Sequence, residues 1–353
     1  MQDIEQLIAC AQQAGASDIH IVCGLPIKCR VDGAMQTLGT EVLTHDDCEA
    51  YAFALAGAQY DTMKDIGEID LARSFLCGAR TRINIFRQRG SASAAIRILS
   101  DHIPDIAELS LPPVVAEFPT YRSGIVLVTG ETGSGKSTTL AALLNCINHT
   151  REGHIITLED PIEYVYEPDK CVINQREIGT DTRSYADGLR SILREDPDII
   201  LIGEMRDLDT ISTALTAAET GHLVFATLHT NSAADSIDRM VSAFPEGQQR
   251  QVRLQVSTTL RAVISQQLLP RKSGQGRVVA CEIMVANSAI KNLIREGKTP
   301  QIDSYITMNA QNGSITMDNA LQTLVRQGVI SSEEALAHCR DRETFTTGAN
   351  RRF

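Results

Sequence analysis

The chain contains no tryptophan, and aromatic residues make up only 4% of its 353 residues. It also has no excess of positive charge, because 33 Lys and Arg residues stand against 44 Asp and Glu residues and give a formal net charge of −11. Proteins that move along DNA or RNA use basic channels and stacking aromatic side chains. The composition therefore disfavours a nucleic-acid translocase, and we expect no direct contact with nucleic acid.

None of the nine cysteines belongs to a C-x-x-C pair, which argues against a zinc knuckle and against a dithiol redox site. An odd number of unpaired thiols fits a reducing compartment. No apolar run approaches the roughly 20 residues that span a bilayer, and the first residues, MQDIEQLIAC, lack the basic flank of a signal peptide. These absences predict a cytoplasmic protein.

The length predicts more than one domain, and a content of 43% hydrophobic and 22% charged residues is that of an ordinary globular protein. A proline-rich stretch at residues 101–123 is the best candidate for a linker. It would separate an N-terminal domain, residues 1–100, from an ATPase core, residues 124–270, and a mainly helical C-terminal region with a tail, residues 271–353.

The N-terminal domain is predicted to be α+β, because strands in hairpins surround one or two helices. The first helix covers residues 4–14, and Thr44 can cap a second. An Asp32-Gly33 pair marks a turn. The strands are expected at residues 18–23, 26–31, 69–75, 80–86 and 94–99.

After the linker, apolar strands alternate with helices, which predicts an α/β fold with a mostly parallel sheet covered on both faces. One more strand is expected at residues 278–285, and Ser331 with Glu334 is typical of the start of a late helix. The tail after Arg342 is expected to be loose. The strands of the core are expected at residues 124–129, 155–158, 199–202 and 223–228.

A phosphate-binding loop follows the first of these strands. The segment from Gly130 to Ser137 matches G-x-x-x-x-G-K-[ST] between an apolar strand and a helix, which is the context that the motif requires. Lys136 would contact the β and γ phosphates of ATP, and Ser137 would ligate Mg²⁺. Thr138 and Thr139 could cap the helix or reach a phosphate. The predicted nucleotide ligands are Gly130, Thr132, Gly133, Ser134, Gly135, Lys136, Ser137 and Thr138.

Carboxylates at the ends of neighbouring strands are the next requirement for hydrolysis. The segment LEDPIEY carries Glu163 close behind a strand that Pro161 ends. Glu204 follows a strand of four branched apolar residues and can hold Mg²⁺ or orient the attacking water. The usual Asp of this motif would stand one position earlier, where this chain has Gly203.

Histidines and arginines complete the candidate set. His222 and His229 bracket an apolar strand, and each is either a sensor of the γ-phosphate or a structural hydrogen-bonding residue. Ring ATPases often use an arginine from a neighbouring domain or subunit. The N-terminal arginines, Arg82 among them, could serve in this way or lie on a solvated sheet face.

Four segments occur here in the order found in the secretion and type IV pilus ATPases, and the chain resembles that superfamily over nearly its whole length. They are GETGSGKSTTLAALL, ITLEDPIEY, DPDIILIGEMRD and AAETGHLVFATLHT. The segment AIKNLIREGK is similar to a signature of the branch that retracts pili, with Lys291 in place of an arginine.

The resemblance implies a homo-hexameric ring in which each subunit has a PAS-like N-terminal domain and a RecA-like motor domain that binds ATP and Mg²⁺. The ring would act at the cytoplasmic face of the inner membrane, at the pilus base, on a membrane-embedded platform protein. The implied roles are base or water-positioning acid for Glu163, Walker B acid for Glu204, histidine-box residues for His222 and His229, and phosphate-reaching arginines for Arg82 and Arg97.

The main alternative is a pilus-extension or type II secretion ATPase of the same superfamily. Those proteins usually carry a tetracysteine zinc site, for which this chain has no matching spacing. A regulatory module without catalysis is a further alternative, and the set Lys136, Ser137, Glu163 and Glu204 speaks against it.

Overall fold

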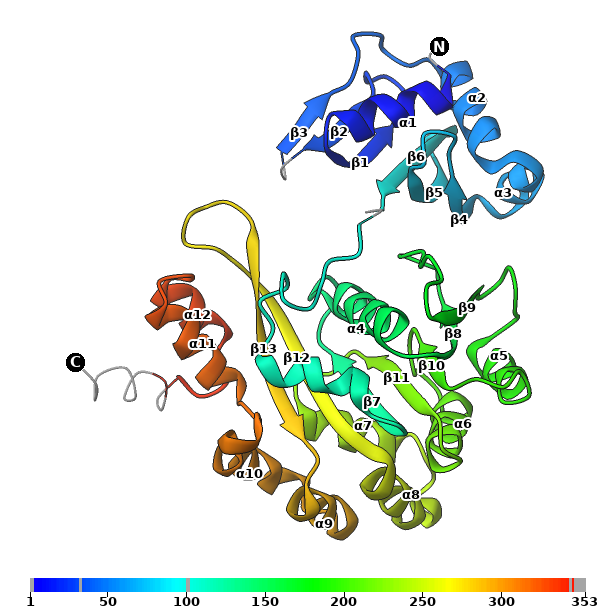
Figure 1. Ribbon diagram of the computed structural model, residues 1–353. Coiled ribbons are helices and arrows are strands. Elements are labelled where there is room, and N and C mark those ends of the chain that lie inside the picture. Colours follow the sequence, from blue (N-terminus) through cyan, green and yellow to red (C-terminus); the bar gives the residue numbers. More distant parts are fainter. Residues whose placement is uncertain (1–2, 32–33, 100–101, 343–344, 346–353) are drawn as a thin grey trace. The chain divides into compact units, whose positions relative to one another are not determined.

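The computed structural model describes residues 3–31, 34–99, 102–342 and 345, and these fall into two compact units (Figure 1). One unit comprises residues 1–102 together with 161–165, and the other comprises the rest of the chain. The predicted turn at Asp32-Gly33 and most of the predicted loose tail lie outside the described residues. The four-part division at residues 100, 123 and 270 stays a prediction.

The N-terminal unit is α+β, as expected. Its sheet has the order β3-β2-β1-β6-β5-β4 with antiparallel pairing throughout. Thr44 caps α2, because its Oγ1 accepts from the N–H of Asp47 and the Asp47 carboxylate accepts from the N–H of Thr44. The elements are α1 (Ile4–Gln13), β1 (Ala16–Ile21), β2 (Lys28–Val31), β3 (Ala34–Thr37), α2 (His45–Ala56), η1 (Gly57–Gln59), α3 (Tyr60–Ile66), β4 (Glu68–Ser74), β5 (Arg80–Gln88) and β6 (Ser91–Ile98).

The second unit is a RecA-like α/β core built on a sheet of order β13-β12-β7-β11-β10-β8-β9. All its strand pairs are parallel except that of β12 with β13. The strands of this unit are β7 (Gly124–Thr129), β8 (Gly153–Glu159), β9 (Cys171–Glu177), β10 (Ile199–Ile202), β11 (Leu223–Leu228), β12 (Leu260–Pro270) and β13 (Arg277–Val285). Its helices are η2 (Pro113–Thr120), α4 (Lys136–Thr150), α5 (Tyr185–Ile192), α6 (Leu208–Glu219), α7 (Ala233–Ser242), α8 (Glu246–Thr259), α9 (Ser288–Glu296), η3 (Thr299–Gln301), α10 (Ile302–Met308), η4 (Ala310–Asn312), α11 (Met317–Arg326) and α12 (Ser332–His338).

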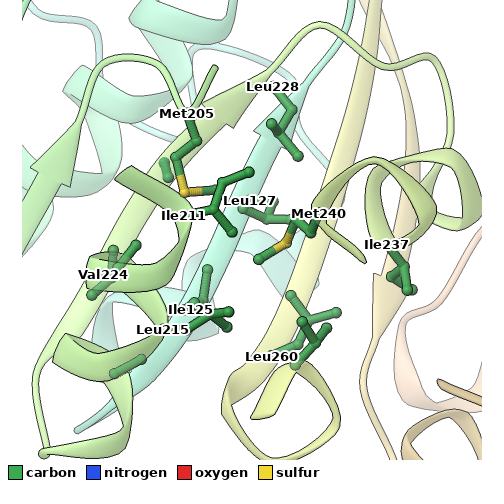
Figure 2. Packing of buried hydrophobic residues seen from close by; sticks show 14 of the residues in the cluster. Ile125, Leu127, Met205, Ile211, Leu215, Val224, Leu228, Ile237, Met240 and Leu260 are labelled. Atoms are coloured by element: carbon green, nitrogen blue, oxygen red, sulfur yellow. The ribbon is translucent and has the colours of Figure 1, made fainter. Parts of the chain in front are cut away.

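The central strands β7, β10 and β11 begin and end at the predicted residues and are buried on both faces. On one face Ile125 and Leu127 of β7 pack with Ile211 and Leu215 of α6 (Figure 2). Burial of a Leu or Ile side chain contributes about 1.5–3 kcal/mol, so this packing fixes the sheet firmly. The carboxyl ends of the parallel strands share one edge, which is where this class of fold builds its sites.

The sequence did not predict β3, β9 or β12. The strand β9 lies at the edge of its sheet and mixes polar with apolar residues, which weakens its apolar signal. Because β12 follows directly on α8, no turn residue separates the two elements. β12 nevertheless pairs with β7 and carries β13 into the same sheet.

Candidate functional site

The carboxyl end of β7 leads into a glycine-rich loop that ends where α4 begins, at Lys136. Three glycines of this loop have positive φ angles, 139° at Gly130, 82° at Gly133 and 93° at Gly135, which other residues rarely adopt. At Gly130 space is limiting as well, because a Cβ would lie 2.4 Å from the carbonyl oxygen of Gln266. The loop therefore needs glycine at its start both for conformation and for close packing on β12.

The loop has the features of an anion site. In the described part of the chain no side chain caps α4, so its positive N-terminal dipole remains available to an anion. The Oγ of Ser134 is buried and finds no hydrogen-bond partner among the described residues, although such groups are nearly always paired. Nζ of Lys136 donates to the carbonyls of Gly130, at 2.8 Å, and Glu131, at 3.0 Å, and so stays over the loop. A phosphate would satisfy each of these groups.

Ser137 and Thr138 lie half-buried in the first turn of α4, and Thr132 is exposed at the loop tip. Thr139 was expected to cap α4 or to reach a phosphate, but in the structure its hydroxyl contacts β12. It is buried, and its Oγ1 accepts a hydrogen bond of 2.8 Å from Nε2 of Gln266. Thr139 thus links α4 to β12.

Glu204 emerges just beyond β10 at the same edge of the sheet as the loop. Its Oε1 lies 2.6 Å from Nε of Arg206 and 3.3 Å from Nε2 of His229, which follows β11. Burial raises the pKa of the Glu204 carboxyl, but the hydrogen bond from Arg206 and the nearby His229 outweigh it, so the pKa lies below its usual value. The carboxylate is therefore charged at neutral pH, as a metal-binding or water-orienting group must be.

Space explains why Gly203 stands where an aspartate is usual. A Cβ at this position would lie 2.8 Å from Oη of Tyr185 and 3.0 Å from the carbonyl oxygen of Leu158. The N–H of Gly203 donates to that same carbonyl at 2.7 Å, which holds the strand end close to β8. The acid therefore moves to Glu204, where a side chain fits.

His222 lies at the opposite edge of the sheet from the phosphate-binding loop. Leu223 is opposite Gly124 in the register of β11 and β7, whereas Leu228 is opposite Thr129. At about 3.3 Å per residue the two ends of β11 are roughly 15–20 Å apart. Nδ1 of His222 lies 2.8 Å from the carbonyl oxygen of Ala217 and so joins the strand to α6. The structure therefore brings His229, and not His222, to the end of the sheet that carries the loop.

The N-terminal unit holds the remaining predicted residues. Arg82 of β5 and Arg97 of β6 are exposed and directly opposite one another, so their side chains share a face. Like charges directly opposite are unfavourable, and Asp18 of β1 offsets part of the repulsion through its Oδ1, 3.1 Å from Nε of Arg97. Glu163 lies in the segment 161–165 of this unit, and its role stays a prediction.

Three residues that no sequence motif marked as functional lie near the phosphate-binding loop or Glu204. Arg206 stands two positions after Glu204 and binds it, and proximity in the motif was the signal for it. Asn231 approaches the loop, with Nδ2 3.5 Å from Oε1 of Glu131. Gln266 supports the loop from β12, and nothing in the sequence marks it because the contact depends on strand pairing.

The chain matches the family of type II/IV secretion system proteins over residues 91–337. It is 46% identical over 344 residues to the Pseudomonas aeruginosa protein named type IV pilus retractation ATPase PilT, which covers 97% of this chain and all of that protein. It is 49% identical to a twitching motility protein of Neisseria gonorrhoeae over 79% of this chain and 75% of the relative.

Solved structures agree with these relatives. The crystal structure of the pilus retraction motor PilT with bound ADP superimposes with a TM-score of 0.91 at 46% identity, covering 97% of this chain and 98% of that one. The ATPase DotB of Legionella pneumophila gives a TM-score of 0.80 at 29% identity, covering 95% of this chain and 94% of the other. The chain is thus similar in sequence and fold to nucleotide-binding motors.

Proposed function

The chain belongs to the family of type II/IV secretion system proteins, and we propose that it is a motor ATPase that couples ATP hydrolysis to the retraction of type IV pili, and so to twitching motility. The observation that carries this function is the full-length similarity to a retraction ATPase together with a complete phosphate-binding loop. The loop, Glu204 and His229 meet at one edge of the sheet, as nucleotide hydrolysis requires.

Binding of ATP would begin at the loop. The phosphates would accept hydrogen bonds from the backbone N–H groups at the start of α4 and from the buried hydroxyl of Ser134. Lys136 would move its ammonium group from the loop carbonyls to the β and γ phosphates. The exchange replaces hydrogen bonds to neutral carbonyl oxygens by hydrogen bonds to charged phosphate oxygens, so it favours binding.

Hydrolysis would use the charged groups at the strand ends. The hydroxyl of Ser137 and the carboxylate of Glu204 suit Mg²⁺, which prefers oxygen ligands, and the lowered pKa keeps Glu204 ionised. When bound, Mg²⁺ would neutralise charge on the β and γ phosphates. His229 would report the state of the γ-phosphate through its contact with Glu204. Glu163 would orient or deprotonate the attacking water.

The arginine pair of the N-terminal unit suggests how subunits cooperate. Two exposed guanidinium groups, on Arg82 and Arg97, face the same side of one sheet, and the carboxylate of Asp18 lies beside Arg97. A planar cation of this kind stabilises charge on a transferring phosphate. We propose that, in a homo-hexameric ring, these two arginines reach the phosphates of a bound nucleotide.

The proposed location is the cytoplasmic face of the inner membrane, where a platform protein at the pilus base would be the partner. Of the residues that the structure describes, none belongs to a helix with the length and hydropathy of a membrane span. The negative net charge, −11, makes direct attachment to anionic lipids unfavourable, which supports association through a protein partner.

Three measurements test this function together. Purified protein should hydrolyse ATP in the presence of Mg²⁺, and its mass in solution should be that of six subunits. A strain without the gene should keep surface pili but lose twitching. A strain that loses its pili altogether would instead identify the chain as an extension ATPase, and a wild-type protein without ATPase activity would contradict the enzymatic function itself.

A further inference from the structure

An ion pair joins the chain just after α12 to β13, the strand at one edge of the sheet. Glu282 of β13 has no exposed surface, and Arg340 follows α12. The guanidinium approaches the carboxylate with both ends, Nη1 at 2.9 Å from Oε2 and Nη2 at 3.1 Å from Oε1. The Glu282 carboxylate is buried, whereas 31% of the Arg340 side chain is exposed. A buried charge is costly to maintain, so this carboxylate calls for a reason other than stability.

The same two side chains hold the segment between β11 and α7. Oε1 of Glu282 accepts from the N–H of Ala233 at 2.9 Å, and Nη2 of Arg340 donates to the carbonyl of Asn231 at 2.7 Å. The segment is thus bound at two of its backbone groups by one ion pair. It begins at His229, which contacts Glu204.

Strand register places this pair level with the start of the phosphate-binding loop. Glu282 is opposite Ser265, Ser265 is opposite Thr129, and Thr129 is opposite Leu228. Oγ1 of Thr129 lies 2.8 Å from Oγ of Ser265 in the buried interior. The row therefore ends at the residues that immediately precede Gly130 and His229.

The segment also reaches the loop directly, through the side chain of Asn231, which lies 3.5 Å from that of Glu131. A displacement of Asn231 by even 1 Å would lengthen this contact beyond hydrogen-bond range. The position of the segment thus bears on both the loop and the Glu204–His229 pair.

We propose that Glu282 and Arg340 form a positioning pair that holds residues 229–232 against the phosphate-binding loop, so that the C-terminal segment controls the turnover rate. The inference rests on the proposed function. Neither residue belongs to the phosphate-binding loop; both act through His229 and Asn231. Loss of the pair should slow catalysis more than it weakens nucleotide binding, because the loop and Lys136 remain intact.

Steady-state kinetics of the full chain test this inference. Arg340→Met should lower kcat about tenfold and change KM less than about twofold. Glu282→Gln keeps the shape of the side chain and an acceptor for Ala233, so it tests the charge alone, and we expect a smaller loss of kcat. Arg340→Lys should have a kcat between those of Arg340→Met and wild type. It keeps the positive charge, but it cannot make the two-ended contact with the carboxylate.

An apolar double variant separates positioning from stability. Apolar replacement of an ion pair whose carboxylate is buried is often neutral for stability, so Glu282→Met with Arg340→Leu should unfold near the wild-type temperature and still turn over slowly. Arg176→Met is the matched control. It breaks another half-buried ion pair of this unit, to Glu195, and should leave kcat unchanged.

Two results would overturn the inference. One is an Arg340→Met or Glu282→Gln protein that is folded and has the wild-type kcat. The other is full recovery of kcat in the apolar double variant, which would show that the pair serves stability alone. Both require an active wild-type enzyme, so a failure of the proposed function appears separately, as an inactive wild type. If Arg340→Met does not fold, Glu282→Gln decides.

Discussion

The hydroxyl of Tyr185 occupies the space that a side chain at Gly203 would need, since a Cβ on Gly203 would lie 2.8 Å from its Oη. Tyr185 is the first residue of α5, and Gly203 follows β10. Burial, together with the nearby Asp160 and Glu204, raises the pKa of Tyr185, which stays protonated. The contact thus accounts for the absence of an aspartate next to Glu204.

Gly203→Ala should destabilise the protein by about 1–3 kcal/mol, because the added methyl meets Tyr185 and the carbonyl of Leu158. Tyr185→Phe in the same chain removes one of these clashes and should restore part of the loss. Unfolding in urea measures both. Gly247→Ala in α8 is the control, since nothing lies within 4 Å of its Cβ and alanine favours helix. Equal stability of both alanine variants would refute the steric explanation.

Lys136 and Glu204 should fail in different ways. Lys136→Met removes the cation from the loop and should weaken binding of a fluorescent ADP analogue by about tenfold or more. Glu204→Gln should keep binding within about threefold and lower kcat by about a hundredfold, because it removes the charge that acts during hydrolysis. Glu219→Gln, on the surface of α6 and bonded to Gln255, is the control and should match wild type. Normal turnover by Glu204→Gln would remove Glu204 from the catalytic set.

Glu49 should make the N-terminal unit sensitive to acid. Burial raises the pKa of Glu49, but hydrogen bonds from Tyr60, Arg87 and the N–H of Ala92 outweigh it, so the folded pKa lies below the usual 4.5. A lowered folded pKa means that the stability contribution is complete above about pH 4.5 and disappears as the pH falls through the folded value.

The melting temperature of Glu49→Gln should therefore lie furthest below that of wild type at pH 7, and the difference should shrink as the pH drops below 4.5. Glu68→Gln, exposed at the start of β4, is the control for the removal of one surface carboxylate. A difference that stays constant from pH 7 to pH 3.5 would mean that the charge of Glu49 contributes nothing to stability.

The cysteines should differ widely in reactivity. Burial raises the pKa of Cys48 to about 11 and that of Cys281 to about 12, whereas Cys10 and Cys77 are exposed. Each unit of pKa lowers the thiolate fraction about tenfold, and only the thiolate reacts. Iodoacetamide at pH 8, followed by peptide mass spectrometry, should show that Cys10 and Cys77 are labelled at least about a hundred times faster than Cys48 and Cys281. Denaturant should remove the difference, and rapid labelling of native Cys281 would contradict the buried site.

Local sequence patterns predicted much of this structure. The apolar runs predicted as strands have the same first and last residues as β7, β10 and β11, because strands buried on both faces need continuous hydrophobic residues. The phosphate-binding loop was equally clear, since its chemistry depends on neighbours in the sequence. Pairings between distant strands left no such mark, so β12 and the support that Gln266 gives to Thr139 went unnoticed.

The amino-acid sequence by itself determined the family, the parallel core and the position of the candidate phosphate-binding loop, because each depends on side chains that are close together in the chain. Only the tertiary structure decided which charged groups meet. His222 and His229 looked alike in the sequence, yet the direction of β11 sends only His229 to the site. The contact of Arg340 with Glu282 likewise exists only because the chain, after α12, returns to the sheet. Proximity in space follows from packing, which local sequence patterns do not encode.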